Sequence, residues 1–184
     1  EILDDETPPQ QVVDKIYAFL ALVNRWLGGQ RATLQRFEAF ARSWPPGARI
    51  EVLDVATGAA DVPRALVEWS RAKGFDLRVT ALDLSSSALS YARRVGPTEA
   101  RLRLVCGDLR HPPCGDHTYD YVTCALFFHH LADDEIVATL RTFDRIARRG
   151  IVVNDLVRTR RAFAWTWFLT RPFHPILGHD GPLG

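Results

Sequence analysis

The chain has 184 residues, with 23 lysines and arginines against 22 acidic residues and a formal net charge of +1. This balance excludes a protein that binds nucleic acid through an excess of positive charge, and the length favours one domain with a substantial core. Its three cysteines (Cys106, Cys114 and Cys124) have neither C-x-x-C nor metal-site spacing, which favours buried thiols in a reducing cytoplasm.

Two helical patterns precede the first strand. Apolar residues at helical spacing predict a helix over residues 10–27, which Gly28 and Gly29 end, and a second helix around 34–41. The Trp-Pro-Pro-Gly sequence at 44–47 ends the second one. We expect residues 1–48 to form a helical cap and residues 49–184 to form the main part of the same structural domain.

Strands and helices alternate from residue 50 onward. Repeated β–α units with apolar, β-branched strands indicate a Rossmann-like α/β fold, with a mostly parallel sheet and helices on both faces. The predicted strands are 50–55, 77–82, 101–106, 119–125 and 150–153; the predicted helices are 61–73, 86–94 (capped by Ser85–Ser87), 134–148 (capped by Asp133) and about 159–170.

The first strand ends in a loop of very small residues, Asp54-Val55-Ala56-Thr57-Gly58-Ala59-Ala60-Asp61. Loops at the carboxyl ends of parallel strands bind ligands, and small residues let a ligand approach the backbone. A nicotinamide dinucleotide is one candidate ligand, but Asp61 would place an anion where its pyrophosphate binds. No lysine follows Lys73 to support hydride chemistry. An NAD(P)-binding oxidoreductase is therefore the weaker alternative.

The same loop resembles the first motif of class I SAM-dependent methyltransferases, D/E-x-G-x-G-x-G, over residues 54–60. SAM has no phosphate and carries positive charge, so nearby carboxylates attract it. Alanines stand at the first and third glycine positions, which is tolerable if φ stays negative, and this leaves Gly58 as the essential position. The resemblance covers residues 10–160. It implies a seven-stranded sheet, whose last two strands we expect to lie outside this sequence.

Two further predicted strands end in acidic residues, at places that the family uses. The resemblance implies that Asp83 accepts the ribose hydroxyls, that Asp108 meets the adenine amino group, and that Leu109 packs on the ring. A simpler alternative is that each aspartate only caps the next helix. The expected cofactor-binding residues are Asp54, Ala56, Thr57, Gly58, Asp61, Asp83, Leu84, Asp108, Leu109 and Ala125, with Arg31 reaching the cofactor carboxylate from a helical lid.

Two consecutive histidines follow the fourth predicted strand, where the resemblance places methyl transfer. His129 and His130 are candidate bases for removing a proton from a phenol or an activated ring carbon, although a loop histidine can also bond only to backbone. We expect one of the two to point into the site. Asn154 and Asp155 are expected to form hydrogen bonds at a strand end rather than to hold a metal, because the fourth strand ends without an acid.

These observations predict an enzyme that transfers a methyl group from SAM to a small acceptor, with S-adenosylhomocysteine as product and no metal. Residues 24–29 and 127–131 are most similar to the small-molecule branch of the family, which includes quinone-biosynthesis enzymes acting on aromatic or polyketide-like metabolites. A catalytically inactive SAM-binding partner of the same fold is the alternative. No apolar run approaches the roughly 20 residues of a membrane span, whereas the aromatic segment 160–169 leaves peripheral membrane contact open.

Overall fold

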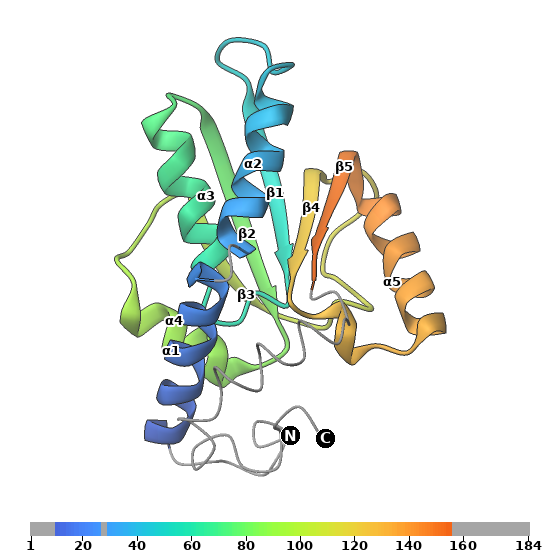
Figure 1. Ribbon diagram of the computed structural model, residues 1–184. Helices are drawn as coiled ribbons and strands as arrows, with labels where there is room; N and C mark the ends of the chain where they lie inside the picture. Colours follow the sequence, from blue (N-terminus) through green and yellow to red (C-terminus); the bar gives the residue numbers. More distant parts are fainter. Residues whose placement is uncertain (1–9, 27–28, 156–184) are drawn as a thin grey trace.

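The computed structural model describes residues 10–26 and 29–155 (Figure 1). The predicted α/β alternation is confirmed, and five parallel strands form one sheet in the order β3-β2-β1-β4-β5. The strands are β1 (Arg49–Val55), β2 (Asp76–Asp83), β3 (Leu102–Cys106), β4 (Tyr119–Ala125) and β5 (Ala147–Asn154). The helices are α1 (Gln10–Trp26), α2 (Gly29–Ala41), α3 (Asp61–Ala72), α4 (Ser86–Val95), η1 (Phe128–His130) and α5 (Asp133–Ile146).

Alternate residues of β1 face two separate cores, because successive side chains of a strand point to opposite faces of a sheet. Ile50 and Val52 pack in one core with Phe37 of α2. Leu53 and Val55 pack in the other core with residues of α5, which lies at the right of Figure 1. Helices therefore cover both faces of the sheet, as the apolar strands predicted.

The central strand β1 pairs with β2 on one side and with β4 on the other. The chain builds the β2 and β3 side first and then crosses to the β4 and β5 side. In open α/β sheets this reversal leaves a crevice outside the carboxyl ends of the central strands, where ligands bind. The fold therefore places the loops after β1, β2 and β4 around one location.

The two N-terminal helices pack on the domain in different ways. Phe37 of α2 is fully buried, and its ring lies edge-on to Tyr121 of β4 at 5.4 Å. Asn154 at the end of β5 donates a hydrogen bond to the Gly29 carbonyl at 2.8 Å. Tyr17 of α1 instead stacks on Tyr91 of α4 at 5.7 Å. Thus α2 belongs to the same core as the sheet, and the division at residue 48 stays a prediction.

Element boundaries differ from the prediction at three places. Gly29 begins α2 instead of ending the preceding helix. The N-cap of α5 is Ala132 rather than Asp133, and the Glu135 carboxylate accepts the Ala132 N–H at 2.9 Å. β5 begins at Ala147, where a helix was predicted to continue to 148. Pairing with β4 overrides the helical pattern there. The predicted helix at 159–170 lies outside the described residues.

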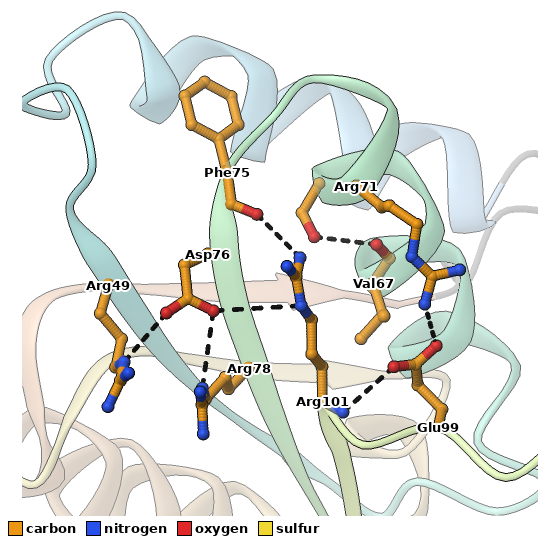
Figure 2. A network of polar contacts seen from close by, with 9 residues as sticks. Arg49, Val67, Arg71, Phe75, Asp76, Arg78, Glu99 and Arg101 are labelled. Atoms are coloured by element: carbon orange, nitrogen blue, oxygen red, sulfur yellow. Dashed lines mark hydrogen bonds and ion pairs between the residues drawn. The ribbon is translucent and has the colours of Figure 1, made fainter.

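A polar network joins the amino ends of β1 and β2 to the segment just before β3 (Figure 2). These amino ends lie at the edge of the sheet opposite the crevice. Asp76 of β2 accepts a hydrogen bond from Arg49 of β1 at 3.0 Å and forms longer ion pairs with Arg78 and Arg101. The hydrogen bond from Arg49 holds the pKa of Asp76 below its usual range. Each exposed pair contributes little to stability, but together they support the strand register.

Among the described helices, none is long and apolar enough to cross a membrane.

Candidate functional site

The loop after β1 places all three glycine positions of the predicted motif in the left-handed region. Ala56, Gly58 and Ala60 have φ values of 53°, 53° and 56°. The condition under which alanine is tolerable at these positions, a negative φ, is therefore not met. Ala60 is the N-cap of α3, where a residue is usually extended, and its side chain makes no capping hydrogen bond. An L-residue in this conformation is strained by about 1–2 kcal/mol.

Asp83 connects this loop to the end of β2. Its carboxylate accepts the Gly58 N–H at 2.7 Å and the Ser85 N–H at 2.8 Å. Its carbonyl accepts the Gly107 N–H, from the loop after β3, at 3.0 Å. Burial raises the pKa of this carboxyl, while the backbone hydrogen bonds oppose that shift. Asp83 thus links three loops, and Ser85 independently caps α4 by accepting the Ala88 N–H.

A cavity of about 390 Å³ opens at the carboxyl ends of these strands. It brings together five residues that the sequence had pointed to: Ala56, Asp83, Leu84, Asp108 and Leu109. Its volume lies within the range of about 300–1,000 Å³ that small-molecule sites occupy. The remaining lining residues are Leu82, Gly107, Arg110, Phe127, Leu131, Glu135, Ala138, Thr139 and Thr142.

The walls of this cavity are mostly apolar, with charge confined to a few places. Leu84 is 68% exposed, which leaves its side chain available to a ligand. Nε and Nη2 of Arg110 both donate to the carboxylate of Asp108, and this ion pair holds the pKa of Asp108 below its usual range. Asp108 thereby neutralises the positive charge of Arg110. The hydrogen bonds described above join Asp83 to backbone N–H groups, so they do not neutralise its negative charge. The site favours a neutral or cationic ligand over a phosphate.

Asp54 lies beneath the loop rather than in the cavity. It is 2% exposed, and its Oδ1 atom has no hydrogen-bond partner among the described residues. Burial raises its pKa to about 8, the Thr57 hydroxyl opposes the rise, and the negative charges of Asp61 and Asp83 add to it. Asp54 is therefore largely protonated at neutral pH. A protonated carboxyl avoids much of the cost of burying a charge.

Replacing Asp54 by asparagine is expected to flatten the pH dependence of stability. The folded-state pKa lies above the ordinary value of 3.8, so the contribution of Asp54 is complete below about pH 4 and lost as pH rises towards 8. The free energy of unfolding of the wild type should fall across that window by up to about 1 kcal/mol per pH unit. Urea unfolding at several pH values measures the slope. Asp76→Asn is the control, and an unchanged slope in Asp54→Asn would contradict the assignment.

His129 is paired with a carboxylate from the neighbouring strand. Its Nδ1 atom lies 2.7 Å from Oδ1 of Asp155, which follows β5, and its backbone N–H donates to Oδ2 at 3.0 Å. Both side chains are partly buried. Asp155 was predicted to form hydrogen bonds at a strand end, and these bonds confirm that prediction. The sequence did not indicate His129 as the partner, because the two residues are 26 positions apart.

The other predicted site residues, like His129, do not line the cavity. Asp61 accepts a hydrogen bond from Gln30 of α2 at 2.9 Å, and Arg31 is exposed on α2. The His130 ring lies 4.0 Å from the ring of His129. Ala125, Thr57 and Gly58 belong to the same strand ends and loop without lining the cavity. In the described part of the chain, no three His, Cys, Asp or Glu side chains are grouped so that they could hold a metal.

Sequence reasoning missed one wall of the cavity. Ala138, Thr139 and Thr142 of α5 line it together with Phe127. Their spacing places them on one helical face, but small and polar side chains give that face no clear hydrophobic signal. Ala138, Thr139 and Thr142 are recognised as cavity residues only once the structure places α5 next to the loops after β2 and β3.

Sequence comparisons connect the chain to one family of domains. A family profile described as "Methyltransferase domain" matches residues 52–150. A demethylmenaquinone methyltransferase of Staphylococcus epidermidis is 31% identical over 103 residues, which are 56% of this chain and 41% of that protein. One from Thermotoga maritima is 35% identical over 102 residues, which are 54% of this chain and 39% of that protein. The chain thus spans less than half the length of these relatives.

Structural comparisons agree on the fold. The DszA carbon methyltransferase superposes with a TM-score of 0.57 at 19% identity, over 73% of this chain and 36% of that one. The CMeT domain of the citrinin polyketide synthase gives a TM-score of 0.55 at 18% identity, over 64% of this chain and 32% of that one. At such identities the likeness concerns the fold alone.

Proposed function

The chain belongs to the methyltransferase domain family, and from this premise we propose that it transfers a methyl group from SAM to a small acceptor molecule. The observation that carries the proposal is the carboxylate of Asp83, bonded to Gly58 and Ser85 at the mouth of a mostly apolar cavity. This arrangement suits a nucleoside without phosphates. A dinucleotide would instead meet the charge of Asp61 at the start of α3.

Four residues of the cavity fit the nucleoside part of SAM. Asp83 offers carboxylate lone pairs to the ribose hydroxyls, since each carboxylate oxygen can accept more than one hydrogen bond. Leu84 and Leu109 supply apolar surfaces for the adenine ring. Asp108, beside Leu109, is an acceptor for the amino group of the adenine. When bound, SAM supplies an electrophilic methyl group on a sulfonium that leaves readily as a thioether.

The pairing of His129 with Asp155 suits a base that accepts the proton of the methyl acceptor. A carboxylate only accepts hydrogen bonds, so the neutral ring donates through Nδ1 and presents Nε2 as the basic atom. The contact at 2.7 Å also fixes the ring orientation and stabilises the charged ring after proton transfer. We assign this role to His129 rather than His130 because Asp155 bonds to it directly.

The acceptor is proposed to be an aromatic, quinone-like metabolite. Two observations support this class. The relatives from Staphylococcus epidermidis and Thermotoga maritima are named demethylmenaquinone methyltransferases. Aromatic residues Phe127 and Phe128 lie directly before His129, and Phe127 lines the cavity. The cysteine usage further supports a cytoplasmic location, since Cys106, Cys114 and Cys124 are free thiols. Only Cys124 is buried, so the expectation of buried thiols is wrong for the exposed Cys106.

A turnover assay tests the proposed function. The chain is incubated with methyl-labelled SAM and a reduced naphthoquinol, with simple phenols alongside, and the organic extract is examined for labelled product. We expect labelled quinol and an equal amount of S-adenosylhomocysteine. Tight binding of SAM without transfer to any acceptor would favour an inactive SAM-binding partner of the same fold, an alternative suggested by the alanines at positions 56 and 60.

A further inference from the structure

The strained loop after β1 is held by an arginine that the proposed reaction does not use. Nη1 of Arg64, in the first turns of α3, donates to the carbonyl of Ala59 at 2.7 Å and to that of Ala60 at 3.4 Å. Nη2 of the same side chain donates to the carbonyl of Ala92, near the end of α4. One guanidinium therefore joins the loop after β1 to the neighbouring helix α4.

Gly96 makes room for this side chain. A Cβ atom at position 96 would overlap Nε and Cζ of Arg64. Gly96 itself has φ −120° and ψ 153°, an extended conformation that any residue adopts. The absence of a side chain at this position is therefore explained by the path of Arg64 and not by backbone strain.

The backbone of Ala60 donates to the Thr57 carbonyl at 2.9 Å and accepts the Arg64 N–H at 3.2 Å, but few side-chain contacts add to these bonds. Ala60, Ala81 and Ala92 form a small buried cluster, and each is fully buried. Their methyl groups make fewer contacts than larger side chains would, so they resist a change of the Ala60 backbone weakly. The left-handed φ of Ala60 is disfavoured for an L-residue, and the hydrogen bonds of Arg64 to the carbonyls of Ala59 and Ala60 offset that cost.

We propose that Arg64 is a positioning residue of the cofactor site, which keeps the alanine-containing loop in its binding conformation by holding the carbonyls of Ala59 and Ala60. This inference rests on the proposed function, because the loop matters for the reaction only if SAM binds against it. Glycine at position 60 would adopt the same conformation without help. The need for Arg64 is thus tied to the alanine at that position.

A double-mutant cycle tests this link. Arg64→Leu is expected to raise the Kd of SAM, measured by calorimetry, about tenfold, because the loop must regain its strained conformation on binding. In the Ala60→Gly background the same replacement should raise the Kd less than about threefold. The loss of the Ala60 methyl group is common to Ala60→Gly and to the double variant, so the cycle cancels it. Equal effects of Arg64→Leu in both backgrounds would overturn the proposal.

Gly96→Ala provides a second variant that leaves Arg64 itself intact. It should displace the guanidinium and reproduce the roughly tenfold loss in SAM affinity, yet cost no further affinity when added to Arg64→Leu. Wild-type affinity in Gly96→Ala would contradict the proposal. If the wild type does not bind SAM, the proposed function fails. The same four proteins of the cycle are then compared by their midpoints of urea unfolding. Additive effects of Arg64→Leu and Ala60→Gly on that midpoint would overturn the role of Arg64 as well.

Discussion

Replacement of Asp83 by alanine is expected to weaken SAM binding by about a hundredfold or more. The carboxylate is the proposed acceptor of the ribose hydroxyls, and hydrogen bonds to a charged group contribute about 1.5–3 kcal/mol each. The same carboxylate also holds the Gly58 and Ser85 N–H groups at 2.7 and 2.8 Å, so its loss releases the loop after β1. Calorimetric titration of SAM into the variant measures the change.

Two further variants separate ribose binding from loop support. Asp83→Asn keeps one carbonyl oxygen as an acceptor and should fall between the wild type and Asp83→Ala in affinity. Asp76→Ala is the matched control, because it removes a carboxylate from the amino end of the same strand, at the edge opposite the cavity (Figure 2). Its affinity for SAM should equal that of the wild type. A Kd for Asp83→Ala within about threefold of the wild type would contradict the ribose assignment.

Replacement of His129 by glutamine is expected to lower kcat by about a hundredfold to a thousandfold while the Kd of SAM stays unchanged. General-base catalysis contributes factors of about 10² to 10⁴, and glutamine cannot accept the proton. The Asp155→Asn variant should lose a similar factor. Its amide can donate to Nδ1, which would leave the ring proton on Nε2, the atom that must be basic.

The His129 prediction is checked by steady-state kinetics with a saturating acceptor, which report the loss of kcat directly. His111→Gln, which changes an exposed histidine of the loop before β4, should keep the wild-type rate. A kcat within about twofold of the wild type in His129→Gln would remove His129 from the mechanism.

The sequence predicted the fold because its signals are local and periodic. Asp54, Asp83 and Asp108 lie at or within two residues of the ends of apolar strands, which places three acidic residues at one edge of a parallel sheet, and two of the three line the cavity. The third, Asp54, is buried beneath the loop, since a strand residue one position before the end can point into the core. Spacing alone does not distinguish these two outcomes.

Contacts between distant residues account for what the sequence did not show. The pairing of His129 with Asp155 depends on how β4 and β5 lie side by side, and the contact of Arg64 with Ala92 depends on how α3 and α4 do. The positive φ of Ala56 and Ala60 was also missed. Alanine gives no signal for that conformation, whereas glycine would have.

The central claim is that the loop after β1 binds a phosphate-free sulfonium nucleoside, and comparative calorimetry tests it most directly. SAM, S-adenosylhomocysteine and NAD⁺ are titrated separately into the wild-type chain under the same conditions. We predict saturable binding of SAM and S-adenosylhomocysteine at one site per chain, and no binding of NAD⁺ at the same concentrations. Saturable binding of NAD⁺ together with no binding of SAM would contradict the claim and favour a dinucleotide-dependent oxidoreductase.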